Sequence, residues 1–163
     1  MTQEERTIQR DRMRFTKDKR SANLVLLAIV FDALYFVSIY QSDPSTYYYN
    51  WTIGASIIYN LLFLLTAFLA SEAVKSRKGG FAPVLIVLGI LQIVRIFYIP
   101  AKAHASVVTV GEVETAVMTD GQYIYVVVCL AVSAACCILA AVNSTINNRA
   151  LAEHMKSVQK QSV

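Results

Sequence analysis

Four long apolar blocks alternate with polar segments along the chain. They cover residues 22–41, 51–72, 81–99 and 122–142. Each is close to the ~20 residues that an α-helix needs to cross about 30 Å of hydrocarbon at ~1.5 Å per residue. The pattern therefore predicts an all-α membrane protein, in which a four-transmembrane-helix bundle spans residues 22–142.

The polar segments around these blocks carry their own signals. Residues 1–21 form a basic N-terminal segment, and residues 143–163 are expected to continue the fourth helix as a tail. A weak apolar stripe at 151, 155 and 158 would suit a partner or the inner leaflet, while a solvated, partly frayed end is the alternative. Pro100 is expected to end the third helix, because proline lacks the N–H that continues a helix.

The segment 100–121 is the one sizeable loop between two blocks. Two short runs rich in β-branched residues flank Gly111-Glu112, which suits a β-hairpin with a tight turn at that dipeptide. A short amphipathic helix is the alternative. We therefore expect a short extracytoplasmic element between the third and fourth helices, with a β-hairpin as the favoured form.

Composition excludes a soluble domain. Hydrophobic residues make up 56% of the chain and charged residues 16%, whereas about a quarter of a typical soluble domain is charged. The net charge of +4 raises the question of nucleic acid. We expect no nucleic-acid partner, because the basic residues flank apolar blocks, where membrane topology explains them.

Lysine and arginine are distributed very unequally between the two predicted sides of the membrane. Thirteen lie on one side: seven in 1–21, three in 73–80 and three in 143–163; the loop 100–121 holds only Lys102. Cytoplasmic loops carry the excess of basic residues. We therefore expect a multi-pass protein of the cell membrane with both termini in the cytoplasm (N-in/C-in).

No catalytic or metal-binding constellation is apparent. Cys129, Cys136 and Cys137 lie in one apolar block without CxxC spacing, and His104 and His154 are expected on opposite sides of the membrane. No phosphate-binding loop accompanies the Gly-Gly pair at 79–80. The expectation is a protein that is not an enzyme and binds no metal or other cofactor.

Polar side chains occur at a similar depth in all four predicted spans. They are Asp32, Asn60, Gln92 with Arg95, and Ser133, each about 8–16 Å below the predicted outer boundary. A lone charge at mid-membrane costs at least ~2.5–3.5 kcal/mol. We therefore predict an Asp32–Arg95 ion pair, supported by Gln92 and Asn60, within an intramembrane polar layer.

The sequence leaves the role of this layer open. It could fix the helix register, form a ligand or proton site open to the outside, or face another subunit, and Arg95 could instead extend outward to the interface. The favoured function is an accessory or interaction subunit of a transport-related membrane complex. The alternative is a small oligomeric transporter or channel with its site at Asp32 and Arg95. Expected partners are the lipid bilayer and either a membrane protein or further copies of the chain.

Overall fold

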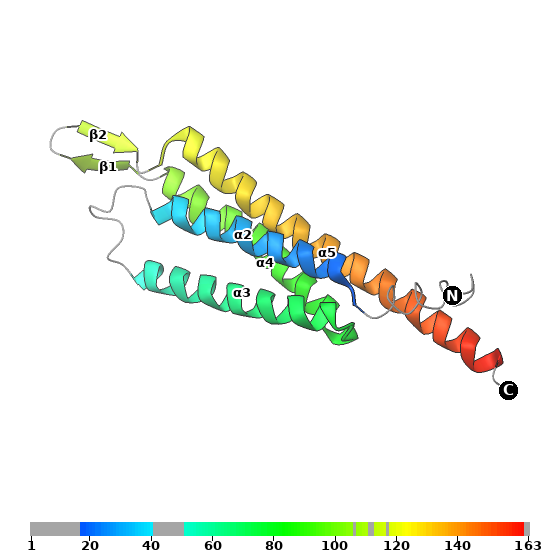
Figure 1. Cartoon of the computed structure of the whole chain (residues 1–163). Coiled ribbons are helices and arrows are strands. Elements are labelled where there is room, and N and C mark those ends of the chain that lie inside the picture. Colours follow the sequence, from blue (N-terminus) through cyan, green and yellow to red (C-terminus); the bar gives the residue numbers. More distant parts are fainter. Residues whose placement is uncertain (1–16, 41–50, 106, 111–112, 117, 162–163) are drawn as a thin grey trace, which may run out of the picture.

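Four long helices, a 3₁₀ turn and two short strands make up the described part of the chain. The computed structural model describes residues 17–40, 51–105, 107–110, 113–116 and 118–161. The elements, in chain order, are α2 (Lys19–Tyr40), α3 (Trp51–Lys75), η1 (Gly79–Phe81), α4 (Ala82–Ala105), β1 (Val107–Val110), β2 (Val113–Ala116) and α5 (Asp120–Gln161). Figure 1 shows an elongated bundle with the strands at one end and the C-terminal part of α5 at the other.

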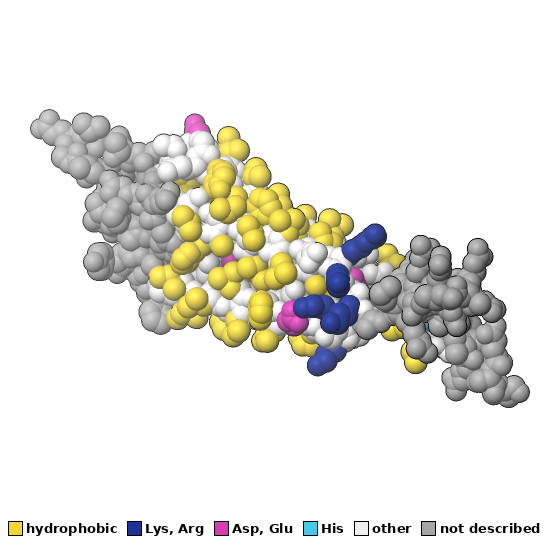
Figure 2. Space-filling model, in the orientation of Figure 1, with side chains coloured by type: hydrophobic (Ala, Val, Ile, Leu, Met, Phe, Trp, Pro, Cys, Tyr) yellow, Lys and Arg dark blue, Asp and Glu magenta, His cyan; other side chains and the backbone are white. Residues whose placement is uncertain are grey.

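All four long helices are long and apolar enough to span a membrane. Large apolar side chains on their outer faces are exposed, including Leu61, Phe68, Val94 and Ile124. Figure 2 shows hydrophobic side chains spread along one face of the bundle, with lysine and arginine side chains gathered at the end toward the C-terminus. Such a surface suits lipid rather than water. The structure thus has the character of a small integral membrane protein.

One helix limit differs from expectation, and another agrees with it. The predicted stop at Pro100 is wrong, because α4 continues through this buried proline to Ala105. Packing of the last turn offsets the lost backbone hydrogen bond, since Ala103 is also buried. The expected continuation of the fourth span is confirmed: α5 is one helix of 42 residues from Asp120 to Gln161.

The two strands follow α4 directly and lead back toward α5. β1 and β2 pair antiparallel, with Val107 opposite Ala116 and Val110 opposite Val113. The turn expected at Gly111-Glu112 lies outside the described residues. The pair lies beyond the end of the bundle in Figure 1.

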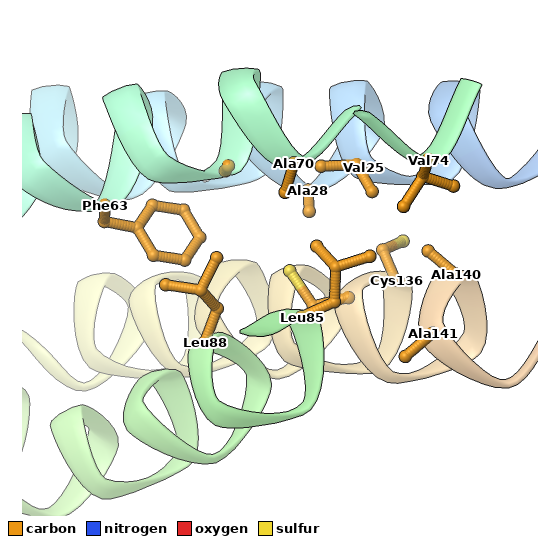
Figure 3. Packing of buried hydrophobic residues seen from close by; sticks show 12 residues of the cluster. Val25, Ala28, Phe63, Ala70, Val74, Leu85, Leu88, Cys136, Ala140 and Ala141 are labelled. Atoms are coloured by element: carbon orange, nitrogen blue, oxygen red, sulfur yellow. The ribbon is translucent and has the colours of Figure 1, made fainter. Parts of the chain in front are cut away.

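Two apolar clusters form the interior. The first joins all four long helices and contains many small residues, among them Ala28, Ala70, Ala140 and Ala141; Figure 3 shows Phe63 of α3 directed toward Leu88 of α4. The second cluster, toward the strands, includes Tyr35, Ile39, Met118, Val126 and Leu130. Small side chains let helix backbones approach closely in lipid. On α2, Asp32 falls between Ala28 of the first cluster and Tyr35 of the second.

The backbone of α4 approaches α5 closely at Gly89. A Cβ atom built there would lie 2.7 Å from Ile138 Cγ1 and 3.2 Å from the backbone oxygen of Ala134, both on α5. Neither a helix backbone atom nor the inner part of a packed side chain moves cheaply. Gly54 of α3, in contrast, has no atom within 4 Å of the corresponding position.

Gly89→Ala is expected to destabilise the bundle by about 1–3 kcal/mol through overpacking. Gly54→Ala is the matched control and should leave the thermal midpoint unchanged or raise it, because alanine favours the helix. Thermal unfolding of both purified variants in detergent measures the difference. Equal midpoints for the two variants would contradict the close α4–α5 approach.

A second polar network lies at the opposite end of the bundle from the strands. Asp18 caps α2 by accepting the backbone N–H of Ser21 at Oδ1 (3.2 Å), and its Oδ2 accepts the Ser21 hydroxyl (2.8 Å) and Asn147 Nδ2 (3.0 Å). Asn143 Nδ2 donates to Ser21 Oγ (2.9 Å). Residues placed by sequence in the basic N-terminal segment and in the tail are therefore part of the packed bundle.

The end of α3 joins the same region. Arg77 has a φ of 56° and terminates the helix, with the N–H of Lys78 donating to the oxygen of Ala73 and that of Arg77 to the oxygen of Val74. In this pattern of two backbone hydrogen bonds, the left-handed position is usually occupied by glycine. Here the arginine side chain also donates from Nη1 to the backbone oxygen of Asn147 (3.1 Å), so the turn attaches α3 to α5.

Acid should weaken this network. Burial opposes ionisation of Asp18, but hydrogen bonds from Asn147 and Ser21 and the nearby charge of Arg77 outweigh it and lower the pKa of Asp18 below 3.8. The stabilisation is therefore fully present above about pH 4 and is lost as the pH falls through the folded-state value. The measurement is the thermal midpoint of wild type and Asp18→Asn between neutral and acid pH. The variant should be less stable at neutral pH, and the gap should narrow in acid; a constant gap would contradict this account.

Candidate functional site

Asp32 lies at the middle of α2, where it contacts two side chains of α4. Its Oδ1 accepts hydrogen bonds from Gln92 Nε2 (2.8 Å) and from Arg95 Nη1 (3.1 Å). Gln92 and Arg95 are three residues apart and so share one face of α4. Asp32 and Gln92 are completely buried and Arg95 is 4% exposed. The predicted contact between Asp32 and Arg95 is thus present inside the bundle.

The Arg95 guanidinium also contacts two aromatic rings. Its central carbon lies 4.2 Å from the ring centroid of Tyr35 on α2 and 4.8 Å from that of Tyr59 on α3. A cation over a desolvated aromatic face gains ~2 kcal/mol or more. Arg95 therefore points into the bundle and does not extend to the membrane interface, which the sequence had left open.

The ion pair uses only part of the hydrogen-bonding capacity of its members. In the described structure, Asp32 Oδ2 and the Arg95 atoms Nε and Nη2 are buried and have no hydrogen-bond partner. An arginine–carboxylate pair is often bidentate, with two parallel hydrogen bonds. Here one nitrogen meets one oxygen, so charge is neutralised while polar atoms remain unsatisfied.

Asn60 and Ser133 lie in the bundle but outside the ion pair's hydrogen bonds. Asn60 is 2% exposed, makes no hydrogen bond to Asp32 or Arg95 in the described residues, and leaves its Oδ1 without a partner. The expected support of the ion pair by Asn60 is therefore not seen. Ser133 Oγ donates instead to the backbone oxygen of Ala28 (3.0 Å), one turn before Asp32 on α2. Ser133 thus attaches α5 to α2.

Two further residues belong to this neighbourhood and were not assigned to the site from sequence. Tyr35 and Tyr59 contact Arg95 directly. Tyr35 could have been found, because it lies one helical turn after Asp32 on the same face. No periodicity selects Tyr59.

Other chemistry-bearing side chains are scattered. Among the described residues, no group of three or more His, Cys, Asp or Glu side chains is placed to hold a metal ion. The three cysteines are free and buried. At the strand end, His104 Nε2 lies 2.9 Å from Asp120 Oδ1, and its ring contacts the ring of Tyr123 in a tilted arrangement with centroids 4.5 Å apart. This contact joins the end of α4 to the start of α5.

Comparison of the chain with models of protein families, with curated proteins and with solved structures finds no match. The polar cluster around Asp32 and Arg95 is therefore the basis on which a function can be inferred. That cluster holds a planar cation, the Arg95 guanidinium, over two aromatic rings and against a carboxylate, inside an apolar environment.

Removing one member of the ion pair should destabilise the bundle strongly. Asp32→Asn leaves an uncompensated buried cation and Arg95→Gln leaves a buried anion, each at a cost of about 3–5 kcal/mol. The double variant should lose less than the sum, because neither charge remains. Folded yield and thermal midpoint in detergent, measured for wild type, both single variants and the double variant, complete this double-mutant cycle.

The Lys75–Glu72 pair is the matched control. It has a shorter N–O distance, 2.8 Å, but its side chains are 37% and 53% exposed. Glu72→Gln should change stability by no more than about 1 kcal/mol. Additive losses at Asp32 and Arg95 would show that the two charges do not stabilise one another.

Proposed function

We propose that the protein is an interaction subunit of a larger complex in the cell membrane, with both termini in the cytoplasm. The observation that carries this proposal is the length of α5. Its 42 residues extend for about 63 Å at ~1.5 Å per residue, roughly twice the hydrocarbon thickness. In Figure 1 the C-terminal part of α5 continues well past the ends of α2, α3 and α4.

The projecting part of α5 has the surface of a docking helix. Ser144 is buried in the bundle, whereas Arg149, Glu153 and Lys156 are exposed; Met155 is exposed at 63%, and Leu151 is partly buried. Leu151 and Met155 are four residues apart, so they lie on one face with charges of both signs around them. A helical segment of a partner with an apolar stripe and mixed charges would complement this face.

The closed ion pair supports the same proposal. Asp32 and Arg95 neutralise one another inside the bundle, where Asp32 is completely buried and Arg95 is 4% exposed. Such a pair holds α2 and α4 in one relative position, which suits a rigid adaptor that presents its two ends to other proteins. The class of complex that we propose is a transport system, which the sequence also favours.

A second function, a small oligomeric transporter or channel, is favoured by one specific observation. Several polar atoms of the intramembrane layer are buried without hydrogen-bond partners in the described structure, including Asp32 Oδ2, Asn60 Oδ1 and Gln92 Oε1. Buried polar atoms are normally paired with protein, water or an ion. Polar atoms on three helices thus retain binding capacity inside the apolar bundle.

Deleting residues 149–163 should abolish complex formation and leave the bundle intact. The full-length protein, purified in a gentle detergent, is expected to carry a partner in fixed stoichiometry, seen by native mass spectrometry, and the shortened protein should lose it. The thermal midpoint should be unchanged, because the deletion starts after the buried Ser144 and the contacts of Asn147.

A photo-cross-linking residue distinguishes docking from chance capture. Placed at Glu153, it should join the partner from the cytoplasmic side; placed at the exposed, apolar Val87 of α4, it should not. Recovery of the protein alone as a stable homo-oligomer, or a partner retained after the deletion, would overturn the interaction-subunit proposal.

A further inference from the structure

Four residues around the Arg95 guanidinium form what we call the acceptor cage: Asp32, Tyr35, Tyr59 and Gln92. The two rings lie 4.2 Å and 4.8 Å from the guanidinium carbon. Asp32 supplies the negative charge, and its Oδ1 receives the hydrogen bonds of Gln92 and Arg95. Carboxylate and aromatic faces together define a site for a cation.

The oxygens of the cage are only partly used by Arg95. Asp32 Oδ2, Gln92 Oε1 and Tyr59 Oη are buried and accept no hydrogen bond in the described structure. The Gln92 amide cannot be turned to relieve this, because its nitrogen is already committed to Asp32. All three atoms are hydrogen-bond acceptors by type, so a ligand that satisfies them must supply N–H or O–H donors.

Arg95 has the complementary excess. Its Nε and Nη2 carry donors without partners, although acceptor oxygens belong to the same cluster. The guanidinium is attached to the backbone of α4, which restricts its position, and it reaches Asp32 through Nη1 alone. A free guanidinium has no tether and can place two parallel N–H bonds on the carboxylate.

We propose that the acceptor cage is a binding site for a small planar cation rich in N–H donors, of the guanidinium or amidinium class, and that Arg95 is its built-in occupant. The positive charge is required by Asp32, the planarity by the two rings, and the N–H donors by the unused oxygens. This inference is independent of the interaction role of α5.

The occupancy by Arg95 has a direct consequence for affinity. A ligand and the arginine side chain compete for the same carboxylate and rings, so the site is competent only in the fraction of molecules whose Arg95 has left it. Apparent affinity falls by that fraction. Wild type should therefore bind a free cation weakly, and removal of the arginine side chain should expose the site.

The test is binding of labelled guanidinium to the detergent-purified full-length Arg95→Ala variant, at low millimolar concentrations far below those that denature proteins. We expect saturable binding to one site, at least about tenfold tighter than in wild type, together with a rise in thermal midpoint. Asp32→Asn combined with Arg95→Ala should abolish both. Sodium chloride at the same ionic strength corrects for screening.

Two probes separate the required features of the ligand. Urea has the shape and the N–H donors without the charge, and tetramethylammonium has the charge without N–H donors; neither should displace guanidinium. Displacement by either at equal concentration, binding retained in the double variant, or no saturable binding to Arg95→Ala would each overturn the proposal.

If Arg95→Ala folds poorly, the effect of guanidinium on its folded yield tests the proposal. The proposal requires guanidinium to rescue it: folded yield should rise when the cation, but not urea, is present during solubilisation. Arg95→Gln, which keeps a polar side chain but removes the charge, serves as the second variant. Failure of guanidinium both to rescue and to bind either variant would show that the cage does not recognise the free cation.

Discussion

The cost of a charge inside an apolar bundle determines the position of Asp32 and of everything that contacts it. In lipid, an isolated carboxylate has neither water nor counter-ion. α4 supplies both a cation and an amide donor on one face, Arg95 and Gln92. Two tyrosines then cover the cation. Because these contacts require one depth and one rotation of α2 against α4, they constrain the remainder of the packing.

α2 makes polar contacts with each of the other three long helices. Ser71 of α3 donates to the backbone oxygen of Ala22 (3.1 Å), Ser133 of α5 donates to that of Ala28 (3.0 Å), and α4 meets Asp32. These bonds lie at successive depths along α2. Apolar packing in lipid is weakly directional, since tails and side chains are equally apolar. Single polar contacts at defined depths give each helix its register.

The two functional proposals concern opposite properties of the molecule. The α5 extension is exposed and polar and reaches beyond the bundle, which suits contact with another protein. The acceptor cage is enclosed, and its charge is balanced within the chain. Both follow from the cost of placing an unpaired charge inside an apolar bundle. Among the described residues, exposed charged side chains such as Arg149, Glu153 and Lys156 lie at one end of the bundle, whereas the buried Asp32–Arg95 pair is neutral as a unit but incompletely hydrogen-bonded.

The sequence by itself determined the number of spans, their approximate limits and the Asp32–Arg95 contact. These follow from hydrophobic length and from the cost of unpaired charge, which need no knowledge of packing. Only the tertiary structure decided that Tyr35 and Tyr59 flank the guanidinium, that Asn60 does not bond to the pair and that Ser133 bonds to α2. The rotation of each helix about its axis depends on all its neighbours at once. For the same reason, α4 continues past Pro100, and Asp18 is bound to Asn147. In both cases the stabilising contacts come from neighbouring elements and not from the local sequence.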